Sequence, residues 1–240
     1  MPRASLNEDE LDAMRQRIAE AALDIYRRNG LAAVSFRQLA DNLGCSHMQP
    51  YRCFANKEAL LVHLRIEGFS RMEEFMRSHA GPAESPHAWL RGLVEGYIGF
   101  ARQHGDEYLL LFSTEQPSPA EFPELLAARR RVFDMAVDAI QQCVDAGDMA
   151  GEPCLLAHRV WIGLHGLMTL HAANQLIHGF DISDLIGPVM SGMFGHGRDA
   201  MNVAVTLSKD GATRLPARQG AGMSPRAETR VRVKHGGRAM

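Results

Sequence analysis

The sequence lacks the features that mark membrane proteins, secreted proteins and disulfide-bonded proteins. No part of its 240 residues approaches the roughly 18 consecutive apolar residues that cross a membrane. No basic N-terminal segment leads into an apolar run, as it would in a secretion signal. The four cysteines, Cys45, Cys53, Cys143 and Cys154, have no Cys-x-x-Cys spacing, so we expect reduced thiols. A cytoplasmic protein without a membrane partner is therefore expected.

Signatures of catalysis are missing as well. The chain has no glycine-rich phosphate loop, no Gly-x-Ser-x-Gly turn and no coherent acid/base pair. His158, His165, His171 and His178 recur six or seven residues apart and would share a helix face, which makes a metal site conceivable. No carboxylate accompanies them at ligand spacing, so the pattern favours no metal site. We expect neither an enzyme nor a bound cofactor.

Alternation typical of strands is also absent, and the apolar residues recur at helical spacing. The prediction is an all-α fold with an N-terminal three-helix DNA-binding domain over residues 8–64. A helical ligand-binding and dimerisation domain is expected over residues 65–195, followed by a basic tail over 196–240. Beyond the first three helices, turn residues separate predicted helices at 57–78, 87–102, 106–112, 124–146, 153–177 and 183–194.

Residues 35–58 carry the most specific pattern in the chain, two short helices joined by a glycine turn. Ser35 with Gln38, and Ser46 with Gln49, each fit a capping box at a helix start. Gly44 stands where a left-handed residue would end the first helix. Such a helix-turn-helix places its second helix in the DNA major groove. An ordinary helical hairpin is the alternative.

The second helix is rich in hydrogen-bonding side chains, which favours DNA binding over simple packing. We expect Ser35, Arg37, Tyr51 and Lys57 to contact phosphates. Met48 and the polar residues His47, Gln49 and Arg52 would face bases, with Ser46 at the start of the helix. With Ser46 as the N-cap, Pro50 would remove the first i to i−4 bond and loosen the helix start.

The run from Gly44 to Leu61 resembles the recognition helix of tetracycline-repressor-type (TetR family) regulators. In that family the pattern is roughly Gly-Val-Ser-x-x-x-Leu-Tyr-x-His/Tyr-Phe-x-x-Lys-Glu-x-Leu, and the resemblance covers about residues 14–64. It implies a dimeric, effector-controlled regulator of transcription that binds a double-stranded operator. Two residues depart from the pattern: Pro50 replaces an aliphatic residue, and Cys53 replaces His or Tyr. We interpret Cys53 as a small, semi-buried apolar residue rather than a redox switch.

Two predicted C-terminal helices are apolar on more than one face, which indicates burial in a core or against a partner. A two-fold interface would cover both, and the resemblance implies a homodimer formed through about 153–177 and 183–194. The segment Trp161-x-x-x-His165-Gly166 also resembles one C-terminal subgroup of the family.

An effector cavity is predicted where aromatic residues of four helices should converge. Its expected lining is Tyr97, Phe100, Tyr108, Phe112, Phe133, Trp161, His165 and Met168. For each residue alone, plain core packing is the alternative. The run Arg129–Arg131 is interpreted as a solvated face or interface rim, with capture of an acidic effector as the alternative.

Charge is unevenly distributed along the chain. The formal net charge is −2, yet residues 195–240 hold nine Lys and Arg against three Asp and Glu. This Gly-, Ala-, Ser- and Pro-containing tail is predicted to be disordered, either adding non-specific attraction to DNA or dispensable.

The functional hypothesis is a ligand-responsive transcriptional repressor that binds a near-palindromic operator as a dimer. A small apolar or aromatic effector would tilt helix 57–78 and release the DNA. A helical ligand-binding or docking module with a degenerate helix-turn-helix is the alternative.

Overall fold

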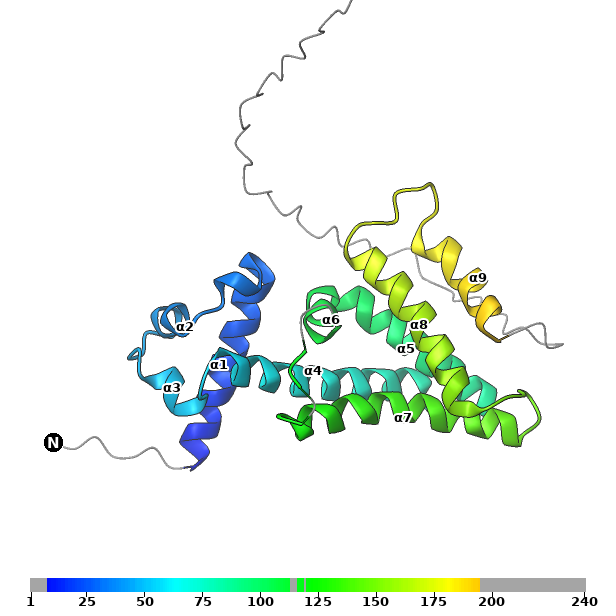
Figure 1. Ribbon diagram of the computed structural model, residues 1–240, viewed down its shortest axis with the longest axis horizontal. Coiled ribbons are helices and arrows are strands. Elements are labelled where there is room, and N and C mark those ends of the chain that lie inside the picture. Colours follow the sequence, from blue (N-terminus) through cyan, green and yellow to red (C-terminus); the bar gives the residue numbers. More distant parts are fainter. Residues whose placement is uncertain (1–7, 113–115, 119, 195–240) are drawn as a thin grey trace, which may run out of the picture. The chain divides into compact units, whose positions relative to one another are not determined.

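The structure is a computed structural model that describes residues 8–112, 116–118 and 120–194, all within one compact unit, Met1–Thr206. The regular elements of these residues are all helical, as predicted (Figure 1). In chain order they are α1 (Glu8–Asn29), the 3-10 turn η1 (Leu31–Ala33), α2 (Phe36–Leu43), α3 (Gln49–Cys53), α4 (Lys57–Ala80), α5 (Pro86–Gln103), α6 (Gly105–Phe112), α7 (Pro123–Asp145), α8 (Pro153–Ala172) and α9 (Ile182–Phe194).

Helices α1 to α3 and the start of α4 enclose a core of their own. Ile18, Leu39 and Leu60 are completely buried in it, together with apolar side chains from the turns between the helices. Leu110 of α6 also belongs to this cluster. The N-terminal helices therefore share their core with a helix of the predicted ligand-binding domain.

Helix α4 continues from one predicted domain into the next. It packs against α5, α6 and α7, and the predicted boundary at residues 64 and 65 falls within it. Asn56 caps its start, because its side-chain oxygen accepts a bond from the Ala59 N–H at 2.8 Å. Because a continuous helix is stiff, a displacement of α4 in the C-terminal helices would be carried towards α2 and α3.

Helix α6 is held against α4 by charged and polar contacts. The buried Glu107 carboxylate accepts a bond from Nε of Arg71 at 2.8 Å and lies 3.9 Å from a guanidinium nitrogen of Arg27 in α1. Nε of the buried Arg65 donates to the Leu110 carbonyl at 3.2 Å. A Cβ at Gly68 would lie 2.7 Å from a Leu111 methyl carbon, so this glycine permits the close approach of α6.

Helix α8 is shorter than the sequence predicted, because Asn174 takes a left-handed conformation with φ 55°. The Asn174 N–H donates to the His171 carbonyl and the Gln175 N–H to the Leu170 carbonyl, the two bonds of a Schellman motif. Asparagine tolerates this conformation better than most residues. His178 therefore lies beyond the helix and does not share a face with the other three histidines.

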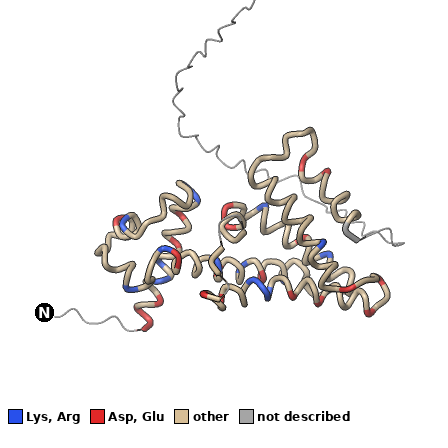
Figure 2. The backbone as a smooth tube through the Cα atoms, viewed as in Figure 1, with Lys and Arg blue, Asp and Glu red and all other residues tan. Residues whose placement is uncertain are grey.

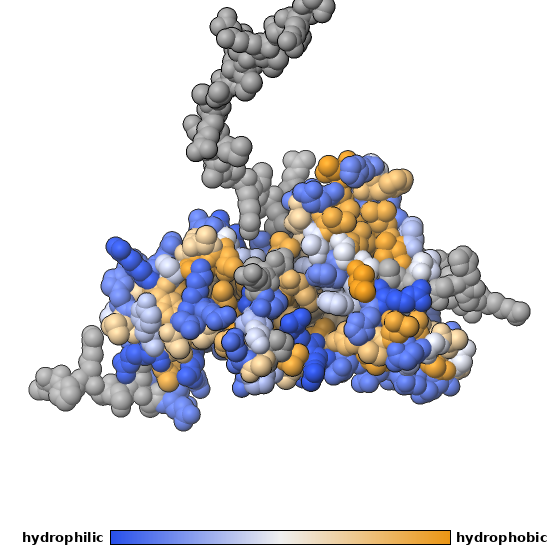
Figure 3. Space-filling view, in the orientation of Figure 1, coloured by the Kyte–Doolittle hydropathy of each residue, from blue (hydrophilic) through white to orange (hydrophobic). Residues whose placement is uncertain are grey.

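Helices α8 and α9 pack against one another and leave apolar side chains exposed. Leu155, Ile162 and Leu170 of α8 are 60%, 63% and 47% exposed, and Ile177 and Phe180 of the following loop are exposed as well. Figure 3 shows hydrophobic surface gathered over this part of the molecule. Within the described residues, no helix is both long enough and apolar enough to span a membrane. The predicted basic tail, 196–240, lies outside the described residues.

Candidate DNA interface and ligand cavity

The first helix of the helix-turn-helix begins and ends where the sequence predicted. The Ser35 hydroxyl accepts a bond from the Gln38 N–H at 3.3 Å, which caps α2. Gly44 takes the left-handed conformation, with φ 61° and ψ 33°, and the Cys45 N–H then donates to the Ala40 carbonyl. This turn directs the chain into α3.

The second helix begins later than the capping pattern predicted. Its N-cap is Met48, without a side-chain cap bond, and the Gln49 N–H donates to the Ser46 carbonyl in a preceding turn. The assignment of Ser46 as N-cap is therefore wrong. Pro50 falls in the first turn of α3, where no intrahelical N–H is required of it, so it fits the helix start rather than loosening it.

Helix α3 is anchored by small and apolar groups on its inner side. Pro50, Cys53 and Phe54 are all buried. Burial raises the pKa of the Cys53 thiol, which keeps the sulfur protonated and less reactive. The interpretation of Cys53 as an apolar packing residue agrees with this position.

The outer side of the helix-turn-helix carries seven exposed residues of the nine predicted to bind DNA: Ser35, Arg37, Ser46, His47, Met48, Tyr51 and Arg52. Gln49 is half-buried. The Tyr51 ring packs edge-on against the buried Phe36 ring, 4.7 Å between centroids, which fixes its direction. His47 Nε2 lies 3.8 Å from an Asp41 carboxylate oxygen. A helix this short with so many exposed donors presents a surface suited to duplex DNA.

Lys57, the ninth residue, has a structural partner. Its ammonium donates to the Leu31 carbonyl at 2.8 Å and is half-buried, so it ties the start of α4 to η1. An ammonium has three donors, and two of them remain for a phosphate.

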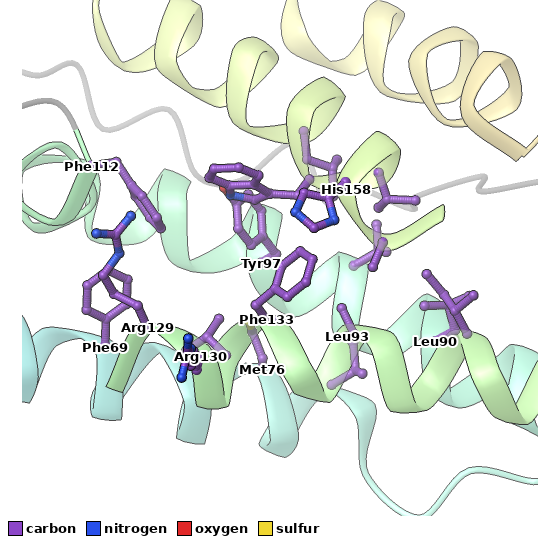
Figure 4. Close-up of a pocket in the computed structure, with 18 of the residues that line it drawn as sticks. Phe69, Met76, Leu90, Leu93, Tyr97, Phe112, Arg129, Arg130, Phe133 and His158 are labelled. Carbon is purple, nitrogen blue, oxygen red and sulfur yellow. The ribbon is translucent and has the colours of Figure 1, made fainter. Parts of the chain in front are cut away.

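The C-terminal helices enclose a cavity of about 370 Å³, within the usual size range of small-molecule sites. Four of the eight predicted lining residues line it: Tyr97, Phe112, Phe133 and Trp161. Figure 4 shows Phe133 projecting from α7 between Tyr97 and His158. The rest of the lining is Phe69, Met76, Leu90, Leu93, Val94, Leu126, Arg129, Arg130, Val132, Ala136, Ile140, Ala157, His158, Val160 and Leu164.

Phe100, Tyr108, His165 and Met168 do not line the cavity, so this part of the prediction differs from the structure. Phe100 and Met168 are buried in the core, which was the alternative considered for them. The Tyr108 hydroxyl shares a hydrogen bond with that of Tyr97 at 2.8 Å and another with Nδ1 of His165 at 2.7 Å. These two residues therefore support the lining Tyr97 from behind.

Burial governs the ionisation of this hydrogen-bonded chain. Desolvation raises the pKa of Tyr97 well above its usual value and that of Tyr108 to about 12. Desolvation also lowers the pKa of His165. At neutral pH the chain is uncharged, so it can position the Tyr97 ring without a buried charge.

Three consecutive arginines on α7 have different surroundings, and they appear as a blue segment on that helix in Figure 2. Arg129 and Arg130 line the cavity, whereas the sequence favoured a solvated face or interface rim. Arg131 instead donates from Nε to a Glu73 carboxylate oxygen at 3.1 Å. The spacing could have revealed the difference, since Arg129 precedes the predicted lining residue Phe133 by one helical turn.

Among the described residues, no group of three or more His, Cys, Asp or Glu side chains is arranged to hold a metal ion. The described part of the cavity lining likewise has no acidic side chain to serve as a ligand.

Residues 90–191, which comprise most of α5 to α9, match a family model described as "Tetracyclin repressor-like, C-terminal domain". This part of the chain is a TetR-type C-terminal domain. Members of the TetR family are transcriptional regulators and not enzymes. No curated protein matches the sequence.

Solved structures share the TetR-family fold at low sequence identity. A protein of unknown function from Rhodococcus sp. RHA1 superposes with a TM-score of 0.67 at 22% identity, covering 81% of this chain and 97% of that one. A tetR-family regulatory protein from Rhodococcus RHA1 superposes with a TM-score of 0.60 at 18% identity, covering 76% of this chain and 97% of that one. The transcriptional regulator FadR from Bacillus subtilis, in complex with stearoyl-CoA, superposes with a TM-score of 0.63 at 14% identity. This match covers 75% of this chain and 97% of that one.

Helices α2 and α3 form the helix-turn-helix that the sequence predicted. Both departures from the family pattern, Pro50 and Cys53, lie on the inner side of α3. They change how the helix is anchored and leave its exposed side chains in place.

Proposed function

We propose that this TetR-family protein is a transcriptional repressor that binds a near-palindromic operator as a homodimer and releases it when a small effector fills the cavity. The action would take place in the cytoplasm. The observation that carries the proposal is the exposed polar face of α2 and α3, joined by the single helix α4 to a ligand-sized cavity.

Support for DNA binding comes from the side chains around α3. Tyr51 and Arg52 project outward from a helix whose inner side is fully packed, and Arg37 is exposed on α2. Tyr51, Arg52 and Arg37 would contact phosphates or base edges, with His47, Met48 and Gln49 at the start of α3 nearest the bases.

Support for a homodimer comes from the apolar side chains on α8 and the loop after it. An exposed isoleucine or leucine is common on proteins, but several on one helix indicate an interface. A two-fold axis along α8 and α9 would present two copies of α3 to successive major grooves.

The effector would be small and largely apolar or aromatic, because most of the lining is aliphatic or aromatic. FadR from Bacillus subtilis, which shares the fold, is described in complex with stearoyl-CoA, an apolar chain joined to a large polar group. We infer that binding in the cavity moves α4, since Phe69 and Met76 of α4 are part of the lining.

Fluorescence anisotropy with DNA from upstream of the protein's own gene tests the proposal. We expect the R52A variant to bind more weakly and to lower the slope of log affinity against log salt by about 0.9. Q49A should relax the choice of base at one position, at a cost of about 1–3 kcal/mol. The matched control is R28A, which removes an exposed arginine at the far end of α1.

Equal effects of R52A and R28A on affinity and salt dependence would contradict a DNA-binding role for α3. Failure of the wild-type protein to bind any duplex in this region would favour the alternative function, a ligand-binding or docking module that does not repress.

A second measurement tests the dimer. Replacing the exposed Ile162 with Glu should convert the dimer to monomers in sedimentation velocity, because it buries a charge at the proposed interface. Replacing Gln141, exposed on α7, with Glu should leave the dimer intact. A wild-type monomer at micromolar concentration would overturn this part of the proposal.

A further inference from the structure

The cavity is basic at one end and apolar at the other. Along α7 its lining follows Leu126 with Arg129 and Arg130 and then with the apolar residues Val132, Phe133, Ala136 and Ile140. The stretch from Arg129 to Ile140 spans about 16 Å of helix. In Figure 4, Arg129 lies beside Phe69 and Phe112, while Leu90 and Leu93 lie at the opposite end of the view. A ligand would therefore meet a charged region and an apolar region in different places.

No carboxylate of the described residues neutralises the two arginines at this end. Neither the Arg129 nor the Arg130 side chain forms an ion pair or hydrogen bond with a described residue, and the described lining holds no Asp or Glu. The neighbouring Arg131, by contrast, is paired with Glu73. The basic end has guanidinium donors that are available to an anion.

The field around Arg129 is reinforced from α4. The pKa of the buried Arg65 guanidinium is lowered, first by desolvation and next by the charge of Arg129, so the two cations lie within electrostatic reach. Glu58 opposes this effect only in part, as a smaller contribution. An anion beside Arg129 would relieve this repulsion, and a cation would add to it.

Resting on the proposed function, we propose that the effector is an anionic amphiphile, an apolar chain or ring system ending in one carboxylate or phosphate. Its charged group contacts Arg129 and Arg130, and its apolar body extends along α7 towards Leu90 and Leu93. Guanidinium groups bind carboxylate and phosphate oxygens with two parallel bonds, which gives such a ligand a defined direction in the cavity.

Aromatic walls by themselves would suit a quaternary ammonium ligand equally well, through cation–π contacts. The charge at the end of the cavity distinguishes the two classes. Its ionisable lining groups are Arg129, Arg130, His158 and the buried Tyr97, with no acidic side chain among the described lining residues. This arrangement disfavours a cation and favours an anion.

Isothermal titration calorimetry with probes of equal chain length tests the proposal on the full chain without DNA. The probes are decanoate, decyl phosphate, 1-decanol and decyltrimethylammonium, each below its micelle-forming concentration. We expect at least one anion to bind about tenfold or more tightly than the alcohol, and the cation to bind more weakly than the alcohol. The tighter of the two anions identifies the charged group.

Matched variants on the same helix locate the charged contact. R129Q should weaken binding of the anion about tenfold and leave binding of 1-decanol unchanged. R130Q should have the same effect to a similar or smaller degree. R131Q makes the same substitution beside them at an exposed residue that is paired with Glu73, and it should leave both affinities unchanged. A136W should abolish binding of anion and alcohol alike, because Ala136 lines the cavity. The arginine variants keep the test decisive should A136W fold poorly.

Equal affinity for the anions and 1-decanol would overturn the proposal, as would tighter binding of the cation or no binding of either anion. Equal effects of R129Q and R131Q would do the same. None of these results bears on DNA binding by α3, which anisotropy with R52A measures separately, so failure of this inference is distinguishable from failure of the proposed function.

Discussion

His165 occupies a position where burial and hydrogen bonding decide its charge. Its Nδ1 shares a hydrogen bond with the Tyr108 hydroxyl, and its ring stacks on Trp161 with 5.7 Å between centroids. Protonation there would place a positive charge among aromatic rings and behind the cavity. Desolvation accordingly lowers the pKa of the imidazole below its ordinary value near 6.5.

A dependence of stability on pH follows. As the pH falls through about 6.5, the unfolded chain binds a proton at this histidine before the folded chain does, so the free energy of unfolding falls. The loss is complete once the pH is below the folded pKa. We expect H165Q to lose less stability than the wild type between pH 7.5 and 5, measured by urea denaturation.

The control for this pH effect is H178Q, which removes an exposed histidine beyond the end of α8. H178Q should lose as much free energy of unfolding between pH 7.5 and 5 as the wild type does. If the free energy of unfolding of H165Q falls over this pH range as much as that of H178Q, His165 does not link folding to protonation.

Residue roles were predictable from sequence where a role depends on local backbone. The Ser35 cap and the left-handed Gly44 follow from residue types at fixed spacing, and both are confirmed. Tyr108 and Tyr97 have the same chemistry and both lie in predicted helices, yet only Tyr97 lines the cavity. That difference depends on how α5 and α6 pack, which no local pattern specifies.

At the scale of elements, two prolines show that the effect of a proline on helix stability depends on its position within the helix. Pro50 lies in the first turn of α3, is buried and replaces no required donor. Pro188 lies inside α9, where it leaves the carbonyl one turn earlier without its usual donor. The sequence placed Pro50 correctly near a helix start but placed that start too early, because Ser46 and Gln49 matched a capping box that the chain instead uses as a turn.

Opposite effects of alanine at these two prolines are expected. P188A should raise the free energy of unfolding by about 1–2 kcal/mol, since it restores a helical hydrogen bond. P50A should lower it by about 1 kcal/mol, through lost buried surface and a more flexible unfolded chain. Guanidinium chloride titration of both variants measures the difference, and stabilisation by P50A would contradict the assignment of Pro50 to the first turn.

At the scale of the whole molecule, Glu107 joins helices of the two predicted domains. Its buried carboxylate contacts Arg71 of α4 and lies near Arg27 of α1, although it belongs to α6. Both arginines are roughly 40% exposed, which moderates the strength of the pairs. Leu110, on the same helix, contributes to the N-terminal core. Helix α6 is thus a shared element of both helical groups.

Removing this carboxylate should lower both the stability of the fold and the coupling between the cavity and the DNA-binding helices. We expect E107Q to lower the free energy of unfolding by about 2 kcal/mol, because a neutral amide buried at this position pairs poorly with the guanidinium donors of Arg71 and Arg27. It should also reduce the effect of a cavity ligand on DNA affinity, measured by anisotropy with and without decanoate. E73Q, which removes the carboxylate paired with Arg77 and Arg131, is the control.

A smaller loss of stability for E107Q than for E73Q would contradict the role given to Glu107. The sequence predicted helices on both sides of this contact with bounds close to those observed. It gave no signal that a glutamate at the start of α6 would reach α1, because residues 27 and 107 meet only through the packing of α4 and α6.

The bond between Lys57 and the Leu31 carbonyl has a mechanical consequence for α4. Fourteen residues separate Lys57 from Arg71, where Glu107 holds the helix, so the free arm between these two attachments is about 21 Å long. A pivot of only about 5° at Arg71 would carry Lys57, and with it η1, sideways by about 2 Å. In a symmetric dimer the two α4 segments would swing in opposite directions, so the distance between the two copies of α3 would change by up to twice that amount.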